Sequence, residues 1–393
     1  MTSEVVPSTM RVMRLSSPAP VSSKPLQLAV VPVPTPGPGE ILIAVHACGV
    51  CHTDLHTVEG ELEPHRSPVV PGHQIVGRVV AFGDRPGERQ RPLVAADGVP
   101  LELGERVGVP WLWKTDGSCP YCRRGDENLC EHAMFTGYDV DGGYAEYTVA
   151  PAEFVYRLPE KMDDLSAAPL LCAGIIGYRS LRLTGVVGSA NAGLPGGAGP
   201  HIGAGESWAG RAAGAMGGAA GAARPRRLGL YGFGAAAHIC IQVAAHRGWE
   251  VYVFTRGAQH RDLALQLGAT WAGASGEAPG GDPAKKLDAA VIFAPAGELA
   301  LDALKAADKG GIVALGGIHS SPIPPIEYPT IYGERVLRSV ANSTRKDALD
   351  LLAEAPQVPV HTEVQVFPLE QANEALIALK QGHIRGAAVL QIR

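Results

Sequence analysis

Thiols and imidazoles are concentrated in one short stretch, residues 48–77, with the sequence CGVCHTDLHTVEGELEPHRSPVVPGHQIVG. Cys51 opens the run Cys-His-Thr-Asp-Leu-His, and His73 follows in a Pro-Gly-His turn. A soft thiolate together with an imidazole suits zinc, and a catalytic zinc ion takes three protein ligands and keeps a fourth position open. The third ligand must come from elsewhere, and Cys172, in the segment PLLCAGIIGYRSL, is the best candidate.

Length and charge limit the class of protein. At 393 residues the chain can form two domains, each with its own core, and a hydrophobic share of 46% fits a soluble globular protein. Lysine and arginine number 34 against 39 acids, so there is no basic field for nucleic acid to follow. The opening residues lack an apolar signal core, and no stretch reaches the roughly 18 apolar residues of a membrane span. We expect a cytoplasmic protein without nucleic-acid or membrane partners.

The seven cysteines give an odd count, which argues against a disulfide framework. Cys119, Cys122 and Cys130 have the spacing of metal ligands, and this usage indicates a reducing compartment. Cys48 and Cys51 have the spacing of a redox pair, but alternation along AVHACGVC favours Cys48 as a buried strand residue.

Two kinds of pattern follow one another along the chain. From Met10 to Tyr156, short β-type runs such as EILIAVHACGV alternate with turns rich in proline and glycine, which predicts a small, barrel-like β domain. The segment from 226 to 256 then has the pattern strand, tight glycine turn, helix, strand. Gly232, Gly234 and Ala237 occupy the three positions of G-x-G-x-x-G/A, where glycine lets pyrophosphate approach the helix N-terminus. Further alternation predicts a six-stranded doubly wound parallel sheet.

The motifs GVCHTDLH, PGH followed by I-V-G, CPYCRRGDENLC, LLCAGIIGY and LYGFGAAAH span most of residues 10–393. Together they resemble those of a zinc-containing alcohol dehydrogenase of the medium-chain dehydrogenase/reductase superfamily. The resemblance implies an α/β protein with a GroES-like β-barrel catalytic domain, residues 1–178 and 343–393. It also implies a Rossmann-type cofactor domain, residues 179–342, with a Gly/Ala-rich insertion at 188–223 that we expect to be flexible because it contains little apolar surface.

The same resemblance implies the reaction, a reversible hydride transfer between an alcohol or aldehyde and NAD or NADP. Cys51, His73 and Cys172 would hold the catalytic zinc, a Lewis acid toward the substrate oxygen. The proton would leave through the hydroxyl of Thr53 and the cofactor ribose to His56.

Three further roles follow from the resemblance. Asp54 would orient His73 through its free ring nitrogen. His52 would face the cofactor phosphates, and Arg385 would contact the pyrophosphate. Trp111 and Trp113 precede a second cysteine cluster, formed by Cys119, Cys122 and Cys130. The family lines its substrate pocket at the positions of these tryptophans, although they could equally be core aromatics. If Trp111 lines the pocket, the substrates are small or slender primary alcohols and aldehydes.

The cluster of Cys119, Cys122 and Cys130 matches three quarters of the family's structural zinc lobe, and Asp116 stands at the missing first position. A carboxylate oxygen is an acceptable zinc ligand, so a structural site of one aspartate and three cysteines is predicted. The alternative is a lobe that has lost its metal.

Cofactor preference is encoded where the second strand of the βαβ unit ends. An acid there favours NAD, but VYVF is followed by Thr255 and Arg256. Threonine can donate to a phosphate, and arginine can form charge-assisted bonds to it. The sequence therefore predicts that NADP(H) is used at least as well as NAD(H), the alternative being an exposed arginine at a strand end.

Two other functions remain open at this point. One is a non-catalytic relative that binds nucleotide, suggested by Gln74, Asp116 and the insertion, since the family usually carries glutamate beside its ligand histidine. The other is a zinc-free quinone reductase of the same superfamily, although such proteins lack the cysteine ligands. As an enzyme, the protein is expected to be a homodimer or homotetramer.

Overall fold

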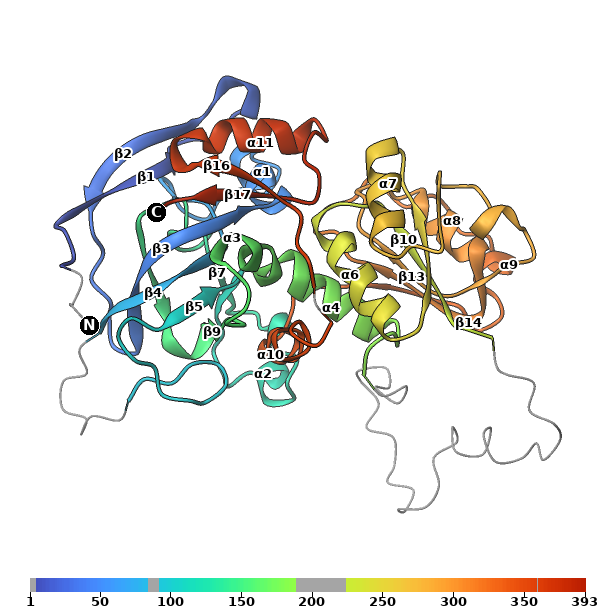
Figure 1. Ribbon diagram of the computed structural model, residues 1–393, viewed down its shortest axis with the longest axis horizontal. Coiled ribbons are helices and arrows are strands. Elements are labelled where there is room, and N and C mark those ends of the chain that lie inside the picture. The colour runs from blue at the N-terminus through green and yellow to red at the C-terminus, as the bar shows by residue number, and fades with distance from the viewer. Residues whose placement is uncertain (1–4, 84–91, 189–223, 359) are drawn as a thin grey trace, which may run out of the picture.

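The computed structural model describes residues 5–83, 92–188, 224–358 and 360–393. Two large sheets organise this part of the chain, one of seven strands and one of six. Figure 1 shows them side by side, with the blue to green strands and the red β16 and β17 in one and the yellow to orange strands in the other. The predicted insertion at 188–223 lies outside the described residues except for Gly188.

The seven-stranded sheet has the order β16-β17-β3-β4-β5-β9, with β8 also paired to β3. Its central strand β3 carries the run EILIAVHACGV, which is buried along almost its whole length because elements pack on both of its faces. Only β16 and β17 pair in parallel. The strands are β3 (Glu40–Val50), β4 (Gln74–Phe82), β5 (Arg106–Val109), β8 (Tyr147–Pro151), β9 (Tyr156–Arg157), β16 (Val364–Pro368) and β17 (Ala387–Gln391).

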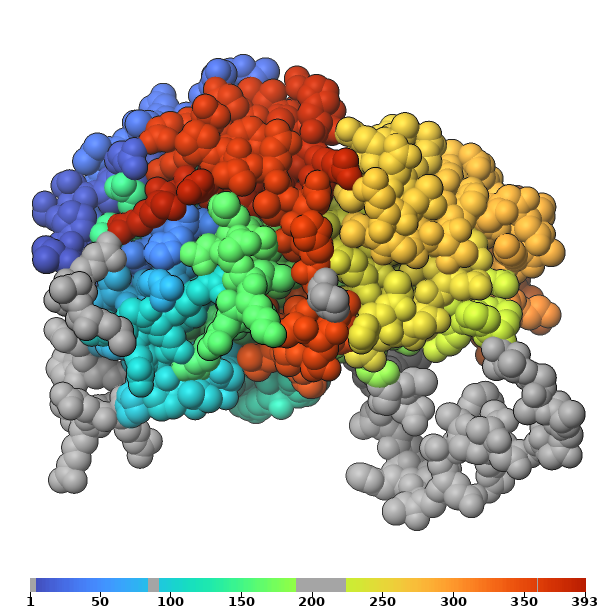
Figure 2. All heavy atoms as spheres, viewed as in Figure 1, coloured from blue at the N-terminus to red at the C-terminus, as the bar shows by residue number. Residues whose placement is uncertain are grey.

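The last strands of the chain complete the sheet that its first half begins. β17 pairs antiparallel with β3, so that Leu390 lies opposite Cys48. Figure 2 shows the same arrangement at the surface, where the red C-terminal segments lie against the blue N-terminal ones. Two small hairpins accompany this sheet, β1 (Thr9–Leu15) with β2 (Leu26–Pro32), and β6 (Leu112–Lys114) with β7 (Met134–Phe135).

The six-stranded sheet has the order β12-β11-β10-β13-β14-β15, and each neighbouring pair is parallel. This confirms the predicted doubly wound sheet. Its strands are β10 (Arg227–Tyr231), β11 (Glu250–Phe254), β12 (Trp271–Gly273), β13 (Leu287–Ile292), β14 (Ala307–Leu315) and β15 (Val336–Ser339).

Strand alternation explains how helices cover both faces of this sheet. Leu228 and Leu230 of β10 belong to the core shared with helix α6, whereas Tyr252 and Phe254 of β11 belong to the core shared with helix α8. Successive side chains of a strand point to opposite faces, so each face presents its own apolar row. The longer helices are α1 (His52–Glu59), α4 (Ala173–Leu183), α6 (Ala235–His246), α7 (Ala258–Gln266), α8 (Leu299–Ala306), α10 (Arg345–Glu354) and α11 (Ala372–Lys380).

The short helices are α2 (Pro120–Arg123), α3 (Asp164–Ala167) and α9 (Tyr328–Ile331). The 3₁₀ turns are η1 (Val21–Ser23), η2 (Glu127–Leu129), η3 (Ala152–Phe154), η4 (Ala168–Leu171), η5 (Pro279–Gly281) and η6 (Leu369–Gln371). Among the helices of the described residues, none combines the length and apolar character that a membrane crossing needs.

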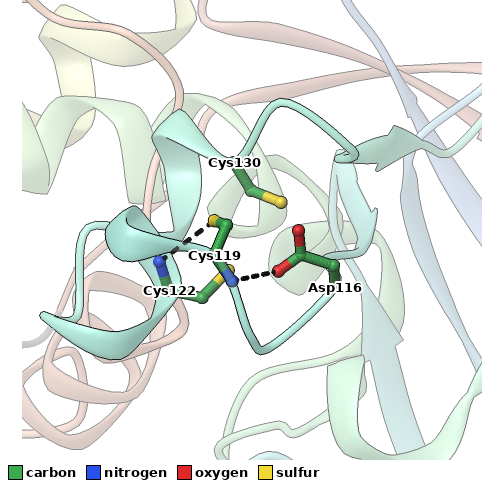
Figure 3. Close-up of side chains that lie close together, drawn as sticks. All are labelled: Asp116, Cys119, Cys122 and Cys130. Atoms are coloured by element: carbon green, nitrogen blue, oxygen red, sulfur yellow. Dashed lines mark hydrogen bonds between the residues drawn. The ribbon is translucent and has the colours of Figure 1, made fainter.

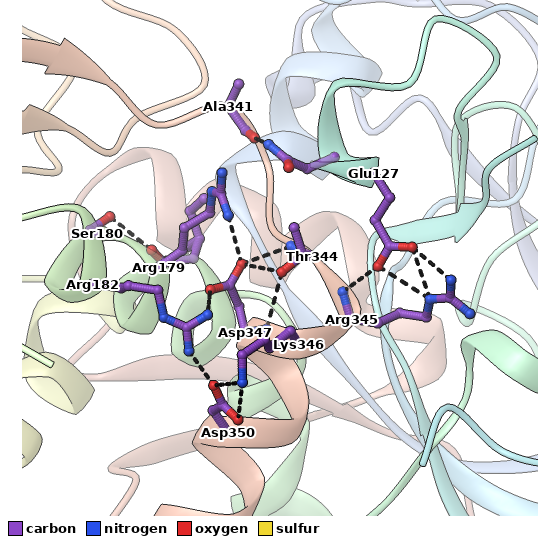
Figure 4. A network of polar contacts seen from close by, with 12 residues as sticks. Glu127, Arg179, Ser180, Arg182, Ala341, Thr344, Arg345, Lys346, Asp347 and Asp350 are labelled. Atoms are coloured by element: carbon purple, nitrogen blue, oxygen red, sulfur yellow. Dashed lines mark hydrogen bonds and ion pairs between the residues drawn. The ribbon is translucent and has the colours of Figure 1, made fainter. Parts of the chain in front are cut away.

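A network of ion pairs ties the loop of the second cysteine cluster to α10 and α4 (Figure 4). Glu127 accepts from the backbone N–H of Arg345 at 2.7 Å and pairs with its guanidinium, also at 2.7 Å. Asp347, fully buried in α10, pairs with Arg179 at 2.9 Å and Arg182 at 2.7 Å. Buried charges are tolerated when they are paired in this way, so the network fixes α10 against α4 and against the loop that contains Glu127.

Candidate active site

Three separate segments supply the predicted catalytic ligands. Cys51 follows β3 and stands at the N-cap of α1, and Cys172 stands at the N-cap of α4. His73 ends a turn that requires glycine at Gly72, where φ is +99° and a Cβ would meet the Tyr144 ring at 2.4 Å. The fold, not local sequence, therefore brings these ligands together.

The three ligand atoms fit a zinc ion. Cys51 Sγ and Cys172 Sγ lie 3.8 Å apart, and His73 Nε2 lies 3.3 Å from Cys172 Sγ. Tetrahedral coordination with Zn–S bonds of about 2.3 Å puts two sulfurs about 3.8 Å apart. His73 is fully buried, while both cysteines are partly open. A closed histidine and two accessible thiols are compatible with three ligands and one open position.

The Asp54 carboxylate organises the turn around these ligands. Its Oδ1 accepts from the His73 Nδ1–H at 3.0 Å and from the Gly72 N–H at 3.1 Å. Its Oδ2 accepts from the Cys51 N–H at 2.9 Å. Since a carboxylate can only accept, Nδ1 of His73 carries a proton, and Nε2 is the nitrogen left to bind a metal, which it does when it is unprotonated. This is the contact predicted for Asp54.

The electrostatics of the ligand set favour a thiolate. The hydrogen bond with Cys172 holds the pKa of the Cys51 thiol well below its usual range, and the neighbouring His73 acts in the same direction against burial. Burial lowers the pKa of His73, but the Asp54 carboxylate and the Cys51 thiol outweigh it and raise this pKa to about 10. The thiolate is the form of cysteine that binds metals.

The hydroxyl and imidazoles of α1 lie beside the ligands. Thr53 is buried, with its Oγ1 3.7 Å from Cys51 Sγ. His56 stands one turn further along the helix, so it shares a face with Thr53. His52 is exposed at the first helical position, and its ring centroid lies 6.4 Å from that of His56.

The two tryptophans differ in environment. The Trp111 ring meets the His73 ring edge-on at 4.9 Å and stacks on Phe135 at 5.0 Å, with Tyr138 at 5.8 Å. Trp113 is buried and donates to the Val149 carbonyl at 3.3 Å. Trp111 therefore forms part of an aromatic wall next to a ligand, and Trp113 belongs to the core.

The second cysteine cluster also converges. Its four residues are Asp116, Cys119, Cys122 and Cys130, and one ligand atom from each lies within 4.8 Å of the others. Figure 3 shows these four side chains close together. Asp116 Oδ1 accepts from the backbone N–H groups of Cys119 and Ser118, each at 2.8 Å. These two bonds hold the pKa of Asp116 well below its usual range. The ionised carboxylate keeps its second oxygen available, so the cluster fits a structural zinc of one aspartate and three cysteines.

The glycine turn after β10 fits a dinucleotide. Gly232 has φ of +84°, and a Cβ there would meet Ala294 at 2.9 Å, so the turn itself requires glycine. Around Gly234, at the N-cap of α6, a Cβ would meet nothing within 4 Å. Open space at a helix N-terminus suits a pyrophosphate, so the geometry is compatible with the predicted role of this turn. Ala237 is fully buried against the core, as its position in the motif requires.

The remaining cofactor candidates lie at helix α7 and the end of β11. Thr255 is buried there and donates its N–H to Gly273, while Arg256 is exposed and has no hydrogen bond or ion pair with any residue of the described ranges. Arg385 donates to Gln266 of α7 at 2.8 Å and lies 3.6 Å from Glu363. Arg385 is thus held against α7, a partner that its motif did not predict.

Comparison with known proteins identifies the family. Residues 37–160 match the family model of the alcohol dehydrogenase GroES-like domain. The chain is 45% identical over 393 residues to the probable alcohol dehydrogenase AdhA of Mycobacterium tuberculosis (strain CDC 1551 / Oshkosh), covering 100% of both chains. The chain belongs to the zinc-type medium-chain alcohol dehydrogenases. An alcohol dehydrogenase of Geobacillus stearothermophilus is 33% identical over 380 residues, with 94% of this chain and 97% of the relative covered.

The fold of this alcohol dehydrogenase agrees with the family as well. The structure of a cinnamyl alcohol dehydrogenase from Sorghum bicolor superimposes with a TM-score of 0.75 at 25% identity, covering 98% of this chain and 97% of the other. The predicted fold class, zinc chemistry and NAD(P)-dependent alcohol oxidation are confirmed. The converging ligands argue against the zinc-free quinone reductase.

Sequence analysis of this dehydrogenase missed part of the aromatic wall. Phe135 and Tyr138 approach Trp111 across the β6–β7 hairpin, a pairing of residues far apart in sequence. It also missed Glu61, whose carboxylate contacts His56 Nδ1. The acid follows the helix terminator Gly60 directly, a signal that a chain reversal could return it to the helix.

Proposed function

We propose that this alcohol dehydrogenase oxidises slender primary alcohols to aldehydes, and the reverse, with NADP(H) at least as good a cofactor as NAD(H). The observation that carries the proposal is the meeting of Cys51, His73 and Cys172 beside the Trp111 ring. A zinc ion held there would supply a Lewis acid for the alcohol oxygen, next to the aromatic wall.

The chain's own residues have separate tasks in this proposal. Asp54 fixes the His73 ring and its tautomer through the 3.0 Å contact to Nδ1. Thr53 accepts and passes on the proton of the alcohol, and His56, on the same face of α1, takes it toward the surface. His52 faces the cofactor phosphates, and Arg385 contributes positive charge near the pyrophosphate. Gly234 leaves the space that the pyrophosphate fills.

The substrate class follows from the shape of the wall. Trp111 and Phe135 stack nearly parallel, with 14° between their ring planes, and so present a flat apolar surface. A flat wall accepts an unbranched chain or an aromatic ring, and a branch at the carbinol carbon would press against it. Primary alcohols such as 1-butanol should therefore be better substrates than 2-butanol.

The cofactor preference rests on the end of β11. Thr255 and the exposed Arg256 stand where an acid would otherwise accept the ribose hydroxyls. Arg261 lies close by, with its Nη1 donating to the Thr255 carbonyl at 3.4 Å. Two guanidinium groups near one strand end favour a 2′-phosphate.

Michaelis constants for both cofactors, with 1-butanol at saturation, test this preference. Arg256→Ala should raise KM for NADP about tenfold and change KM for NAD by less than about twofold, because a charge-assisted contact to the phosphate is worth roughly 1.4 kcal/mol. Arg226→Ala, at the opposite end of β10 and over the Trp249 ring, is the matched control. A strong NAD preference that Arg256→Ala leaves unchanged would refute the preference for NADP.

We also propose the wider organisation. The catalytic domain comprises residues 1–178 and 343–393, and the cofactor domain 179–342, since β15 is the last strand of the six-stranded sheet and α10 follows it. The enzyme acts in the cytoplasm as a homodimer or homotetramer. Size-exclusion chromatography with light scattering would measure the assembly, and a monomer would refute it.

A further inference from the structure

His56 has two neighbours that the proposed mechanism does not yet use. Its Nδ1 contacts the Glu61 carboxylate, and its ring centroid lies 5.6 Å from that of His319. The side chain of His56 is 13% exposed, whereas that of Glu61 is 49% exposed. The imidazole is therefore mostly shielded from water, whereas the carboxylate that contacts it is accessible to water.

The chain geometry after α1 explains how Glu61 reaches His56. Gly60 ends the helix with φ of +81°, a conformation that reverses the chain and favours glycine. The Leu62 N–H then donates to the His56 carbonyl at 3.1 Å. The chain therefore folds back over the last turn of α1 at residue 61, and this places the Glu61 carboxylate next to the His56 ring.

The contact fixes the tautomer of His56. A carboxylate only accepts hydrogen bonds, so Nδ1 must carry the proton that Glu61 accepts. The other nitrogen, Nε2, keeps its lone pair and can receive a proton. A carboxylate bonded to Nδ1 holds the imidazole in one tautomer and one orientation, and it stabilises the imidazolium that forms when Nε2 takes up a proton.

His319 comes from the other side of the active site. It follows β14 of the six-stranded sheet, whereas His56 and Glu61 belong to segments packed on the seven-stranded sheet. The two rings are tilted by 49°. The His319 ring thus covers His56 only when the two sheets are in their observed arrangement.

Resting on the proposed dehydrogenase function, we propose that Glu61 is a positioning residue that completes the proton exit through His56, with the His319 ring as its cover. In alcohol oxidation the substrate loses one hydride to the nicotinamide and one proton to solvent. His56 Nε2 accepts that proton, the Nδ1 proton passes through Glu61 to water, and proton exchange with water then returns the ring to its Nδ1–H form for the next turnover. The imidazolium that forms is balanced by the adjacent carboxylate.

The other charged groups around His56 do not replace Glu61. Glu59, on the same helix, is engaged by Lys380 at 2.7 Å and by the Val21 N–H at 2.8 Å. His52 and His319 face the same ring and offer no carboxylate. Among the described residues, Glu61 is the acid in contact with the His56 ring.

Stopped-flow measurements on the zinc-loaded enzyme with 1-butanol test the inference. Nicotinamide absorbance follows hydride transfer, and a pH-indicator dye follows proton release. Glu61→Gln keeps the size of the side chain but removes its charge, and it should lower kcat about tenfold while KM for alcohol stays within about twofold. Adding imidazole buffer should restore much of the lost rate, because a diffusing base then removes the proton.

Glu63→Gln is the matched control. It makes the same charge change in the same exposed loop, and the hydrogen bond at this residue involves only its backbone carbonyl, which accepts from Tyr138. It should leave kcat and its buffer dependence unchanged. His319→Phe should keep the ring contact and most of the rate, whereas His319→Ala should lower kcat about threefold.

The possible outcomes distinguish a failure of the Glu61 proposal from a failure of the proposed alcohol dehydrogenase function. Absence of hydride transfer in the unaltered enzyme would overturn the proposed function together with the inference. Normal hydride transfer with Glu61→Gln indistinguishable from Glu63→Gln would overturn the inference alone. The same conclusion would follow if buffer failed to restore the rate of Glu61→Gln, since a purely structural defect does not respond to a diffusing base.

Discussion

The two cysteine groups of this protein are assembled in different ways. Cys51, His73 and Cys172 come from three segments that are far apart in the chain, whereas the cluster from Asp116 to Cys130 lies within a single short stretch. The catalytic group thus depends on the whole fold. The loop cluster can form locally, and its metal would brace the loop rather than take part in the reaction. Breaking each group should therefore damage a different property.

The largest effect is expected for Cys51→Ser. A serine hydroxyl is a much poorer zinc ligand than a thiolate, so the catalytic metal should be lost and kcat should fall by about a thousandfold or more. Thermal stability should change little, because Cys51 is only partly buried. Cys240→Ser, at a buried cysteine of α6 outside both groups, makes the same chemical change and serves as control. Steady-state kinetics with 1-butanol measure the effect, and full activity of Cys51→Ser would contradict the ligand assignment.

Cys122→Ser should do the reverse. The loop cluster would lose its metal, and the melting temperature should fall by about 5 °C, since Glu127 of the same loop holds the N-terminus of α10. The kcat at 25 °C should stay within about threefold. Differential scanning calorimetry and steady-state kinetics on the same preparation measure both quantities. A collapse of kcat without any loss of stability would show that the loop serves the reaction directly.

A third prediction concerns the loss of folding stability at low pH, and it separates the contribution of a buried histidine from that of protonated metal ligands. His238 of α6 is fully buried, and neither ring nitrogen has a hydrogen-bond partner among the described residues. Burial lowers its pKa to about 4, and the nearby backbone of Gly234 and Ala235, which makes no well-formed hydrogen bond to the ring, opposes this only in part. The unfolded chain therefore takes up the proton first as pH falls. Stability is complete above about pH 6.5 and is lost between about pH 6.5 and 4.

His238→Leu should remove this dependence. At pH 5 the wild type should have lost about 2 kcal/mol of its pH 7.5 stability through His238, and the variant should lose that much less. Metal ligands protonate equally in both proteins, so the difference between their urea midpoints isolates the buried histidine. Parallel midpoints over this pH range would show that His238 is not buried as a neutral ring.

Local patterns predicted much of this molecule from its sequence. The spacing of Gly232, Gly234 and Ala237 predicted the strand-turn-helix unit of β10 and α6, and the alternation of strands and helices predicted the six-stranded sheet. These features depend on residues near one another in the chain, so their physical chemistry can be read directly.

Contacts between distant segments could not be predicted in this way. The environments of Trp111 and Trp113 differ because one faces the ligands and the other the core, although the two stand two residues apart. The approach of His319 to His56 joins two sheets, and the Arg385 contact with Gln266 joins the C-terminal segment to α7. Such pairs are decided by tertiary packing, which a single sequence does not reveal.

Zinc stoichiometry tests the comparison most directly. Elemental analysis by inductively coupled plasma mass spectrometry, run on the unaltered chain, Cys51→Ser and Cys122→Ser, should give about two, one and one zinc ions per chain. Alcohol oxidation should be lost in Cys51→Ser, which lacks the catalytic zinc, and should be retained in Cys122→Ser, which lacks the structural zinc. If Cys51→Ser kept the zinc content of the unaltered chain, or if a zinc-free preparation still oxidised 1-butanol, the assignment of a catalytic zinc to Cys51, His73 and Cys172 would be wrong.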